Sequence, residues 1–243
     1  MINNSFKNIA ITGASGAIGK SFVKILSEIN SVETINVFSR SNEIFNSEKV
    51  FNHVVKYENE NDLIEAAKIA SFKNTLDLVI VANGILHNEN IYPEKKISDL
   101  TEEKFKELFF VNTILPSIIA KHFIPKMSHS NKSIFAFMSA RVGSISDNKL
   151  GGWYAYRSSK AALNMMIKNL SIEVGRKNKN AILVGLHPGT VNSNLSKPFQ
   201  SNVPEKKLFS PDQSVNYLLK VLFNLRSEDT GKIFAWDGTE IQP

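Results

Sequence analysis

The stretch TGASGAIG at residues 12–19 decides the fold of this chain of 243 residues. An apolar run at residues 9–11 stands directly before it, and apolar residues at helical spacing follow it. Glycine permits unusual φ angles and close approach of the backbone, so main-chain N–H groups and a helix N-terminus can hold a pyrophosphate here. The loop therefore favours a dinucleotide site, lined by Gly13, Ser15, Gly16, Ile18 and Gly19.

Strand-like and helix-like segments alternate along the rest of the chain. The pattern predicts buried strands at 9–11, 34–38, 76–82, 133–138, 181–186 and 232–235. It predicts helices at 17–29, 62–72, 101–127, 153–176 and 211–225. Such alternation is typical of an α/β fold, here a Rossmann-like, doubly wound parallel sheet flanked by helices on both faces in three layers, α/β/α. No linker or repeat divides the chain, so residues 1–243 are expected to form a single domain.

Three long irregular stretches follow the carboxyl ends of predicted strands, at 85–99, 143–152 and 192–209. Ligands of open α/β sheets bind at these ends, so we expect the three stretches to be substrate loops. Trp153, Tyr154 and Phe199 stand at their edges and are candidate pocket walls, although aromatic residues are as often part of a core.

The composition narrows the choice of partners and compartment. The net charge is +6, but Lys and Arg are interleaved with Glu and Asp, which argues against a nucleic-acid partner. The chain has no cysteine, and no apolar run approaches the roughly 20 residues that span a bilayer. The five histidines form no cluster with metal-ligand spacing, so no metal site is expected. We expect a soluble, cytoplasmic protein that does not bind a membrane.

Ser39 and Arg40 close the second predicted strand, where a dinucleotide fold meets the adenosine ribose. An acidic residue there would accept a hydrogen bond from the ribose 2′-hydroxyl, whereas Arg40 would attract a 2′-phosphate. The position therefore favours NADP(H) over NAD(H). The alternative interpretation of Arg40 is a solvated surface arginine.

Tyr156 and Lys160 lie four residues apart in a segment with helical periodicity, so their side chains project from one face. A free tyrosine is only about 0.1% ionised at pH 7, too little for an efficient base. A neighbouring ammonium group favours the phenolate, so Lys160 is expected to lower the pKa of Tyr156. A Tyr/Lys pair at this spacing also occurs by chance on many helices. The glycine loop upstream is what favours a catalytic role for this pair.

Together these residues resemble the short-chain dehydrogenase/reductase family, from about Lys7 to the C-terminus. The loop at 12–19 looks like the family's cofactor loop, the triplet ANG at 82–84 like its motif after the fourth strand, and Tyr156 with Lys160 like its active-site pair. The segment HPGTV at 187–191 resembles the Pro-Gly segment that lines the nicotinamide. Within the family, the chain looks most like the C-factor-like, carbonyl-reductase-like subgroup, on the segments ILH at 85–87, PEK at 93–95, SARVGSI at 139–145 and GGWYAYR at 151–157.

The resemblance implies hydride transfer between a nicotinamide and a carbonyl or alcohol carbon. Tyr156 would be the general acid in reduction and the general base in oxidation, and Lys160 would tune it and bind the nicotinamide ribose. Ser139 would hold the substrate oxygen, and Asn112 would support a water-linked proton relay to the lysine. Besides the glycine loop, Ser39 and Arg40, the residues implied to bind the cofactor are Asn83, Gly84, Tyr156, Lys160, Pro188, Gly189 and Val191.

The chain departs from the family pattern at two positions. Ala17 stands where the usual loop has its middle glycine, and the spacing of the three loop glycines instead resembles the extended branch of the family. Ala140 stands three residues before Gly143, where the family often has its catalytic serine. Successive residues of a strand face opposite sides, so Ser139 is displaced in direction, and Ser144 is the alternative catalytic serine.

The sequence is therefore compatible with two functions. The first is an NADP(H)-dependent oxidoreductase acting on a carbonyl or alcohol carbon of a small or medium organic substrate. The alternative is a non-catalytic NADP(H)-binding sensor, signalling or interaction protein on the same fold, which Ala17 and Ala140 leave open. A homodimer is expected, with a tetramer as the alternative, because an apolar stripe on the 153–176 helix, together with the 101–127 helix, resembles the family's dimerising surface. The stripe consists of Leu163, Met166, Ile167 and Leu170, and packing within the chain is the alternative explanation for it.

Overall fold

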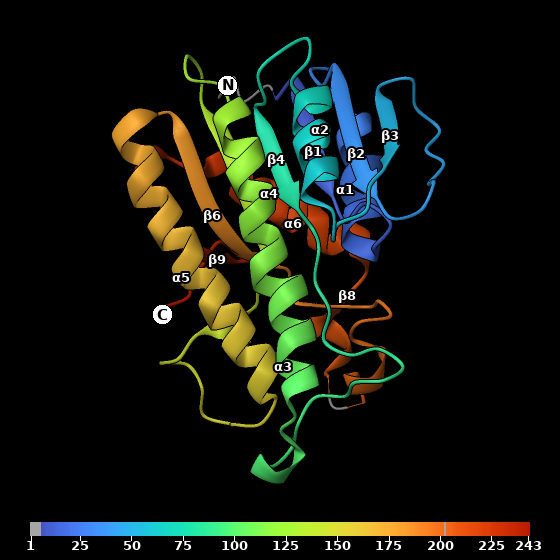
Figure 1. Ribbon diagram of the computed structural model, residues 1–243, viewed down its shortest axis with the longest axis vertical. Coiled ribbons are helices and arrows are strands. Elements are labelled where there is room, and N and C mark those ends of the chain that lie inside the picture. The colour runs from blue at the N-terminus through green and yellow to red at the C-terminus, as the bar shows by residue number, and fades with distance from the viewer. Residues whose placement is uncertain (1–5, 202) are drawn as a thin grey trace.

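A computed structural model describes residues 6–201 and 203–243, and a seven-stranded parallel sheet forms its centre (Figure 1). The strands lie in the order β3-β2-β1-β4-β5-β6-β9. Their bounds are β1 Asn8–Thr12, β2 Thr34–Ser39, β3 Val50–Val54, β4 Leu78–Val81, β5 Ser133–Met138, β6 Ala181–His187 and β9 Ile233–Ala235. The order reverses between β1 and β4, which opens a crevice at the carboxyl ends of these two neighbouring strands.

Helices cover both faces of the sheet. On one face lie α1 (Ala17–Ser27) and α6 (Pro211–Asn224). The other face carries α2 (Glu60–Ala70), α4 (Leu115–Phe123) and α5 (Tyr154–Lys177), and α3 (Glu102–Phe109) runs on into α4 (Figure 1). The predicted three-layer α/β/α fold with a Rossmann-like, doubly wound sheet is thus confirmed.

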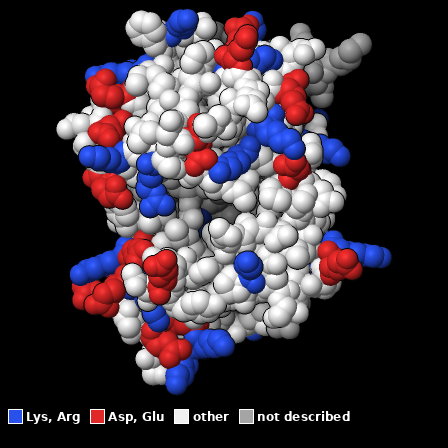
Figure 2. Space-filling model, turned by 90° about the vertical axis from the view of Figure 1, so that its right-hand side faces the viewer, with Lys and Arg blue, Asp and Glu red and all other residues white. Residues whose placement is uncertain are grey.

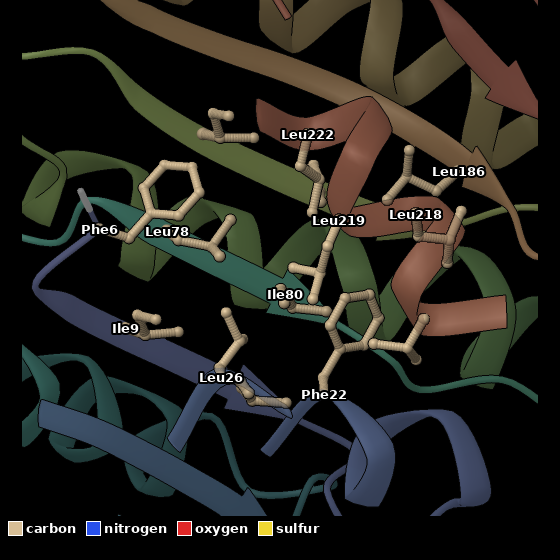
Figure 3. Close-up of a cluster of buried hydrophobic side chains, with 14 of the residues drawn as sticks. Phe6, Ile9, Phe22, Leu26, Leu78, Ile80, Leu186, Leu218, Leu219 and Leu222 are labelled. Atoms are coloured by element: carbon tan, nitrogen blue, oxygen red, sulfur yellow. The ribbon is translucent and has the colours of Figure 1, made fainter. Parts of the chain in front are cut away.

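Alternate residues of the strands supply two separate cores. In β5, Ile134 and Ala136 pack toward α1 and α6, whereas Phe135 and Phe137 pack toward the opposite helical layer. Figure 3 shows the first of these cores, where Phe22 of α1 meets the sheet. Because both faces of the sheet are covered, its central strands are continuous apolar runs, the pattern from which they were predicted.

The helix expected at 101–127 is not one regular α-helix. It consists of α3, a π-helical turn at Phe110–Ile114, α4 and a final 3-10 turn at Ile124–Lys126. Pro116 has no N–H, so it cannot donate the bond that an α-helix would direct to the carbonyl of Asn112. The chain adopts a π turn just before the proline, a feature that is frequent at functional sites.

The same stretch, Glu102–Lys126, is long and apolar enough to cross a membrane by length and composition alone. In the structure it lies on the sheet, with Leu115, Ile119 and Phe123 buried in the core. The stretch is apolar because these side chains are packed in the core.

Two strand features were missed from the sequence. The edge strand β3 contains the exposed residues Phe51 and Val54, so it lacks the continuous buried apolar run of the inner strands. The expected loop at 192–209 ends in a short strand, β8 (Leu208–Phe209), which pairs with β7 (Thr190–Val191). Residue 202 of this loop and residues 1–5 of the expected domain lie outside the described residues.

The apolar stripe on α5 proves to be largely an intrachain contact. Leu163 and Ile167 are buried in the core beneath the helix, and Leu170 packs against the same core. Intrachain packing, the alternative explanation of the stripe, therefore accounts for these three residues. The apolar side chains that α5 exposes are Met165 and Ile172.

Candidate active site

Two glycines let the loop after β1 pass close to its neighbours. Gly13 has φ +71°, and a Cβ there would lie 2.7 Å from the backbone of Ala82 and Asn83. A Cβ on Gly19 would lie 2.4 Å from the carbonyl oxygen of Gly13. Gly16 precedes α1, whose first turn contains no acidic residue, so its N-terminal N–H groups are suited to an anion. Ala17, which stands where the usual family loop has a glycine, is the first residue of α1.

A tyrosine that no sequence motif indicated holds the glycine loop. The Tyr57 hydroxyl accepts a hydrogen bond from the Gly13 N–H at 2.8 Å and donates one to the Phe38 carbonyl at 2.7 Å. On the other side of the loop, the Thr12 hydroxyl donates to Asn83 Oδ1 at 2.6 Å. These bonds tie the loop to both neighbouring strands.

Two adjoining cavities follow the carboxyl ends of the strands. They enclose about 300 and 340 Å³, a size that suits small-molecule sites, and both are lined by Ala82, Asn83 and Gly84. Of the expected site residues, Gly13, Ser15, Gly16 and Arg40 line the first cavity; Ile18, Ser139, Tyr156, Lys160, Pro188, Gly189 and Val191 line the second. The shared wall joins the cavities into one cleft between the glycine loop and the Tyr156/Lys160 pair.

Arg40 is exposed at the first cavity, and no ion pair with it is formed by the described residues. Glu58 lines the same cavity. Ser39 is fully buried, its hydroxyl donates to the Ser41 carbonyl, and it is not among the described residues that line either cavity. Of this pair, the structure brings only Arg40 to the cavity wall.

Tyr156 and Lys160 meet at the second cavity, on the first turns of α5. Lys160 Nζ lies 5.9 Å from the Tyr156 ring centroid and donates to the Met138 carbonyl at 2.8 Å. Both side chains are buried, and burial raises the pKa of Tyr156 and lowers that of Lys160 to about 7. The net shift of the Tyr156 pKa is thus opposite to the lowering expected from the ammonium group, because desolvation of the buried phenol is its main cause.

Asn112 connects the π turn to the active-site helix. Its Oδ1 accepts from the Ile85 N–H and its Nδ2 donates to the Ile85 carbonyl, both at 2.9 Å, and Nδ2 also reaches Ser159 Oγ at 3.2 Å. A Cβ on Gly84 would lie 3.4 Å from both Asn112 Oδ1 and Lys160 Nζ, so these groups are neighbours. The side chain thereby fixes the start of the loop at 85–99 beside Lys160.

The two candidate serines differ in their surroundings. Ser139 lines the second cavity, but its hydroxyl donates to Asn164 Oδ1 at 2.6 Å. The Ser144 hydroxyl accepts from the Asp147 N–H at 3.1 Å within its own loop, and Ser144 is not among the described residues that line the cavity. Ala140, by contrast, lies in one buried cluster with Tyr156.

The N-terminus of α5 is built from an unusual turn. Gly151, Gly152 and Trp153 have φ values of +62°, +64° and +50°, so a bulky tryptophan adopts a left-handed conformation that it rarely takes. Glu94, 1% exposed, holds this turn: its carbonyl accepts from the Trp153 N–H and its Oε2 from the Ala155 N–H at 3.3 Å. Glu94 belongs to the PEK segment at 93–95, which carries part of the family resemblance, but no sequence signal indicates this capping role.

Aromatic rings form much of the cavity wall. Trp153 and Phe199 line it with their ring centroids 5.0 Å apart, and Trp153 also contacts the Tyr156 ring. Tyr154 is not among the described lining residues. His187 lines the cavity, and its Nδ1 is buried without a hydrogen-bond partner in the described part of the chain.

A cleft for a dinucleotide, with a tyrosine and a lysine at the reacting end, defines a nicotinamide-dependent oxidoreductase of carbonyl or alcohol groups. The family model for short chain dehydrogenases matches residues 7–204, and the chain belongs to that family. No group of three or more metal-ligating side chains occurs among residues 6–201 and 203–243.

Several known proteins are similar to this chain. An uncharacterized oxidoreductase of Schizosaccharomyces pombe, C663.09c, is 28% identical over 95% of this chain and 96% of its own. C-signal of Myxococcus xanthus is 31% identical over 60% of this chain and 82% of its own. The structure of NADPH-bound carbonyl reductase from chicken fatty liver superimposes with a TM-score of 0.85 at 24% identity, covering 100% of this chain and 96% of the other.

Proposed function

We propose that this protein is an NADP(H)-dependent reductase of the carbonyl group of a small or medium organic substrate. The observation that carries the proposal is the Tyr156 hydroxyl, which lines the second cavity and has no hydrogen-bond partner among the described residues. Burial raises its pKa, so the phenol holds its proton at neutral pH. The proton is then available for a substrate oxygen in reduction.

The other residues of the cleft fit a nicotinamide dinucleotide. Gly13 and Gly19 let the loop pack closely against Ala82, Asn83 and itself, so the loop can present its N–H groups and the N-terminus of α1 to a pyrophosphate. Gly189 lies at the Tyr156 end of the cleft. When bound, the reduced cofactor supplies a hydride to the carbonyl carbon. Lys160, with a pKa of about 7, can return a proton to Tyr156 after each turnover.

NADP(H) is the proposed cofactor because Arg40 is the only Lys or Arg among the described residues that line the first cavity. Its guanidinium group is unpaired among the described residues and suits a 2′-phosphate.

The variant Tyr156→Phe tests the proposed reaction. We expect it to retain NADPH binding, measured by cofactor fluorescence, and to lose about 10²- to 10⁴-fold in the rate of NADPH oxidation with a carbonyl substrate. Tyr154→Phe is the matched control, because this tyrosine is two residues away and is not a described lining residue of the cavity. Full activity of Tyr156→Phe would show that the proton donor is assigned wrongly.

A second function is favoured by one observation: Ala140, which shares a buried cluster and a cavity wall with Tyr156, has a methyl group and no hydroxyl. It is the non-catalytic sensor or signalling protein, and the similarity to C-signal is consistent with it. Such a protein would bind NADPH tightly and turn over no carbonyl compound in a broad screen. Tyr156-dependent turnover of any carbonyl excludes it.

We further propose that the protein acts in the cytoplasm as a homodimer, with a tetramer as the alternative, without a nucleic-acid or membrane partner. On the face shown in Figure 2, Lys and Arg alternate with Asp and Glu, and mostly uncharged side chains surround a central hollow. No stripe of one charge that would suit a nucleic acid is visible on that face.

A further inference from the structure

The walls of the second cavity offer a substrate no counter-charge. Among the described lining residues, Lys160 is the only Lys, Arg, Asp or Glu, and its ammonium group already donates to the Met138 carbonyl. Burial lowers the pKa of His187 to about 4, so this residue is neutral at pH 7. The remaining walls are largely apolar, with Leu86, Val142, Trp153, Leu195, Phe199 and Val203. A carboxylate or phosphate would lose its hydration here without compensation.

Tyr156 is also the only free hydroxyl that the described residues place on the wall formed by β5 and α5. Ala140, which belongs to the same buried cluster as Tyr156, has only a methyl group as its side chain. The Ser139 hydroxyl donates its hydrogen bond to Asn164 Oδ1, and the Ser144 hydroxyl accepts from the backbone of its own loop. The other hydroxyls that line the cavity, Thr190, Ser193 and Ser196, belong to the segment after β6, and Ser196 donates to the Val191 carbonyl.

We infer that the substrate is an uncharged, apolar carbonyl compound made electron-poor by an adjacent electron-withdrawing group, such as a second carbonyl. The inference rests on the proposed function. Each well-placed donor to a developing oxyanion accelerates a reaction by about 10²- to 10³-fold, and this wall supplies one donor. In a substrate with an adjacent electron-withdrawing group, part of the negative charge that develops on the carbonyl oxygen moves into that group. Such a substrate depends less on a second hydrogen-bond donor than an unactivated ketone does.

The reduction requires only the hydride of the reduced cofactor, the proton of Tyr156, and Lys160 or water to restore that proton. The hydride brings two electrons and forms the new C–H bond, while the C=O π bond breaks and its electron pair moves to the oxygen. That oxygen takes the proton of the Tyr156 hydroxyl, which gives an alcohol and the oxidised cofactor. The Tyr156 phenolate regains a proton from the Lys160 ammonium group or from water.

The variant Ala140→Ser tests the inference by placing a second hydroxyl beside Tyr156. kcat/KM with NADPH is measured for acetophenone, an unactivated ketone, and for 1-phenyl-1,2-propanedione, which carries a second carbonyl. The natural protein should prefer the dione, and the variant should reduce acetophenone about 10- to 100-fold faster while the dione changes less than about threefold. Equal changes for both substrates, or equal rates in the natural protein, overturn the inference.

A second measurement needs no turnover. The C=O stretching frequency of ¹³C-labelled acetophenone is recorded in the complex with oxidised NADP, because each hydrogen bond to the oxygen lowers this frequency. We expect Ala140→Ser to lower it below the natural protein's value, and Ala140→Cys, similar in size but a weak donor, to leave it nearly unchanged. An unchanged frequency in Ala140→Ser would show that position 140 does not face the carbonyl and would overturn the inference.

Failure of the inference can be told apart from failure of the proposed function. Tyr156-dependent reduction of an anionic carbonyl such as glyoxylate, without reduction of the apolar dione, would overturn the substrate class and leave the proposed function intact. If NADPH binds and no carbonyl of either kind is reduced, the proposed function fails and the substrate class fails with it.

Discussion

Arg40, directly after β2, is the side chain proposed to select NADP(H) over NAD(H). We expect Arg40→Glu to weaken NADPH binding about 10- to 100-fold, because a charge-assisted contact to the 2′-phosphate is replaced by repulsion. NADH binding should change less than about threefold. Fluorescence titration with both cofactors measures the difference, and Arg226→Glu on the loop after α6 serves as a control with the same change in charge. Equal losses for the two cofactors would remove the basis for NADP(H).

His187 should make the stability of the protein depend on pH. Burial, and secondarily the nearby Arg141, lower its pKa to about 4 in the folded state, against about 6.5 when unfolded. The unfolded state therefore binds the proton more readily, so the contribution to stability is complete above pH 6.5 and is lost as the pH falls toward 4. We expect the free energy of unfolding in urea to fall by about 2 kcal/mol between pH 6.5 and 4.5 through this residue.

The matched variant for this prediction is His187→Gln, in which the decline with pH should be smaller by that amount. His129→Gln, at an exposed histidine, should follow the natural protein. An identical decline in His187→Gln and the natural protein would mean that His187 does not titrate as described.

At the scale of elements, the most important junction lies between the loop at 85–99 and α5. The N-cap position Trp153 makes no side-chain capping bond, and Glu94 from the distant loop accepts the Ala155 N–H instead. Its carboxylate also lies at the positive end of the helix dipole. The loop that borders the cavity and the helix that carries Tyr156 are therefore held by the same buried side chain.

Glu94→Ala should lower the free energy of unfolding by roughly 1–2 kcal/mol, as the loss of a helix cap does. It should also reduce kcat more than it raises KM, because Tyr156 sits on the first turn that the cap orders. Glu94→Gln, which can still accept the Ala155 N–H, should recover most of both losses. Glu89→Ala, at an exposed residue of the same loop, is the control; a similar effect of Glu89→Ala would show that the loop and not the cap is responsible.

At the scale of the whole molecule, α4 and α5 lie side by side over one face of the sheet (Figure 1). Next to them the chain exposes Ile114, and α5 itself exposes Met165 and Ile172. These side chains provide apolar area for the proposed homodimer, since the Leu163 face is already buried within the chain.

Met165→Glu should convert the proposed dimer into a monomer, because it places a charge in the apolar contact. Light scattering after size-exclusion chromatography measures the mass. Phe72→Glu is the control, because Phe72 is 85% exposed on the segment after α2. A mass of two chains in Met165→Glu would place the interface elsewhere.

Much of this molecule could be predicted from short-range sequence patterns. The inner strands were located because burial on both faces makes them apolar throughout, and the edge strand β3 was missed because Phe51 and Val54 remain exposed. The pair Tyr156/Lys160 was placed on one helical face by spacing alone, and the structure puts both side chains at one cavity. Tyr57 and Glu94 were not predicted, because each acts on a partner that is far away in the sequence.

The parallel α/β fold, the glycine loop and the Tyr156/Lys160 pair can be read from the sequence alone, because period, spacing and glycine content are local properties of a chain. The surroundings of these groups become known only from the folded chain. Ser139 is hydrogen-bonded to Asn164, Ala140 lines the same cavity as Tyr156, and burial is the main cause of the raised pKa of the tyrosine. Such properties arise when β5 and α5 pack together and exclude water, and no pattern along the chain records which atoms then meet.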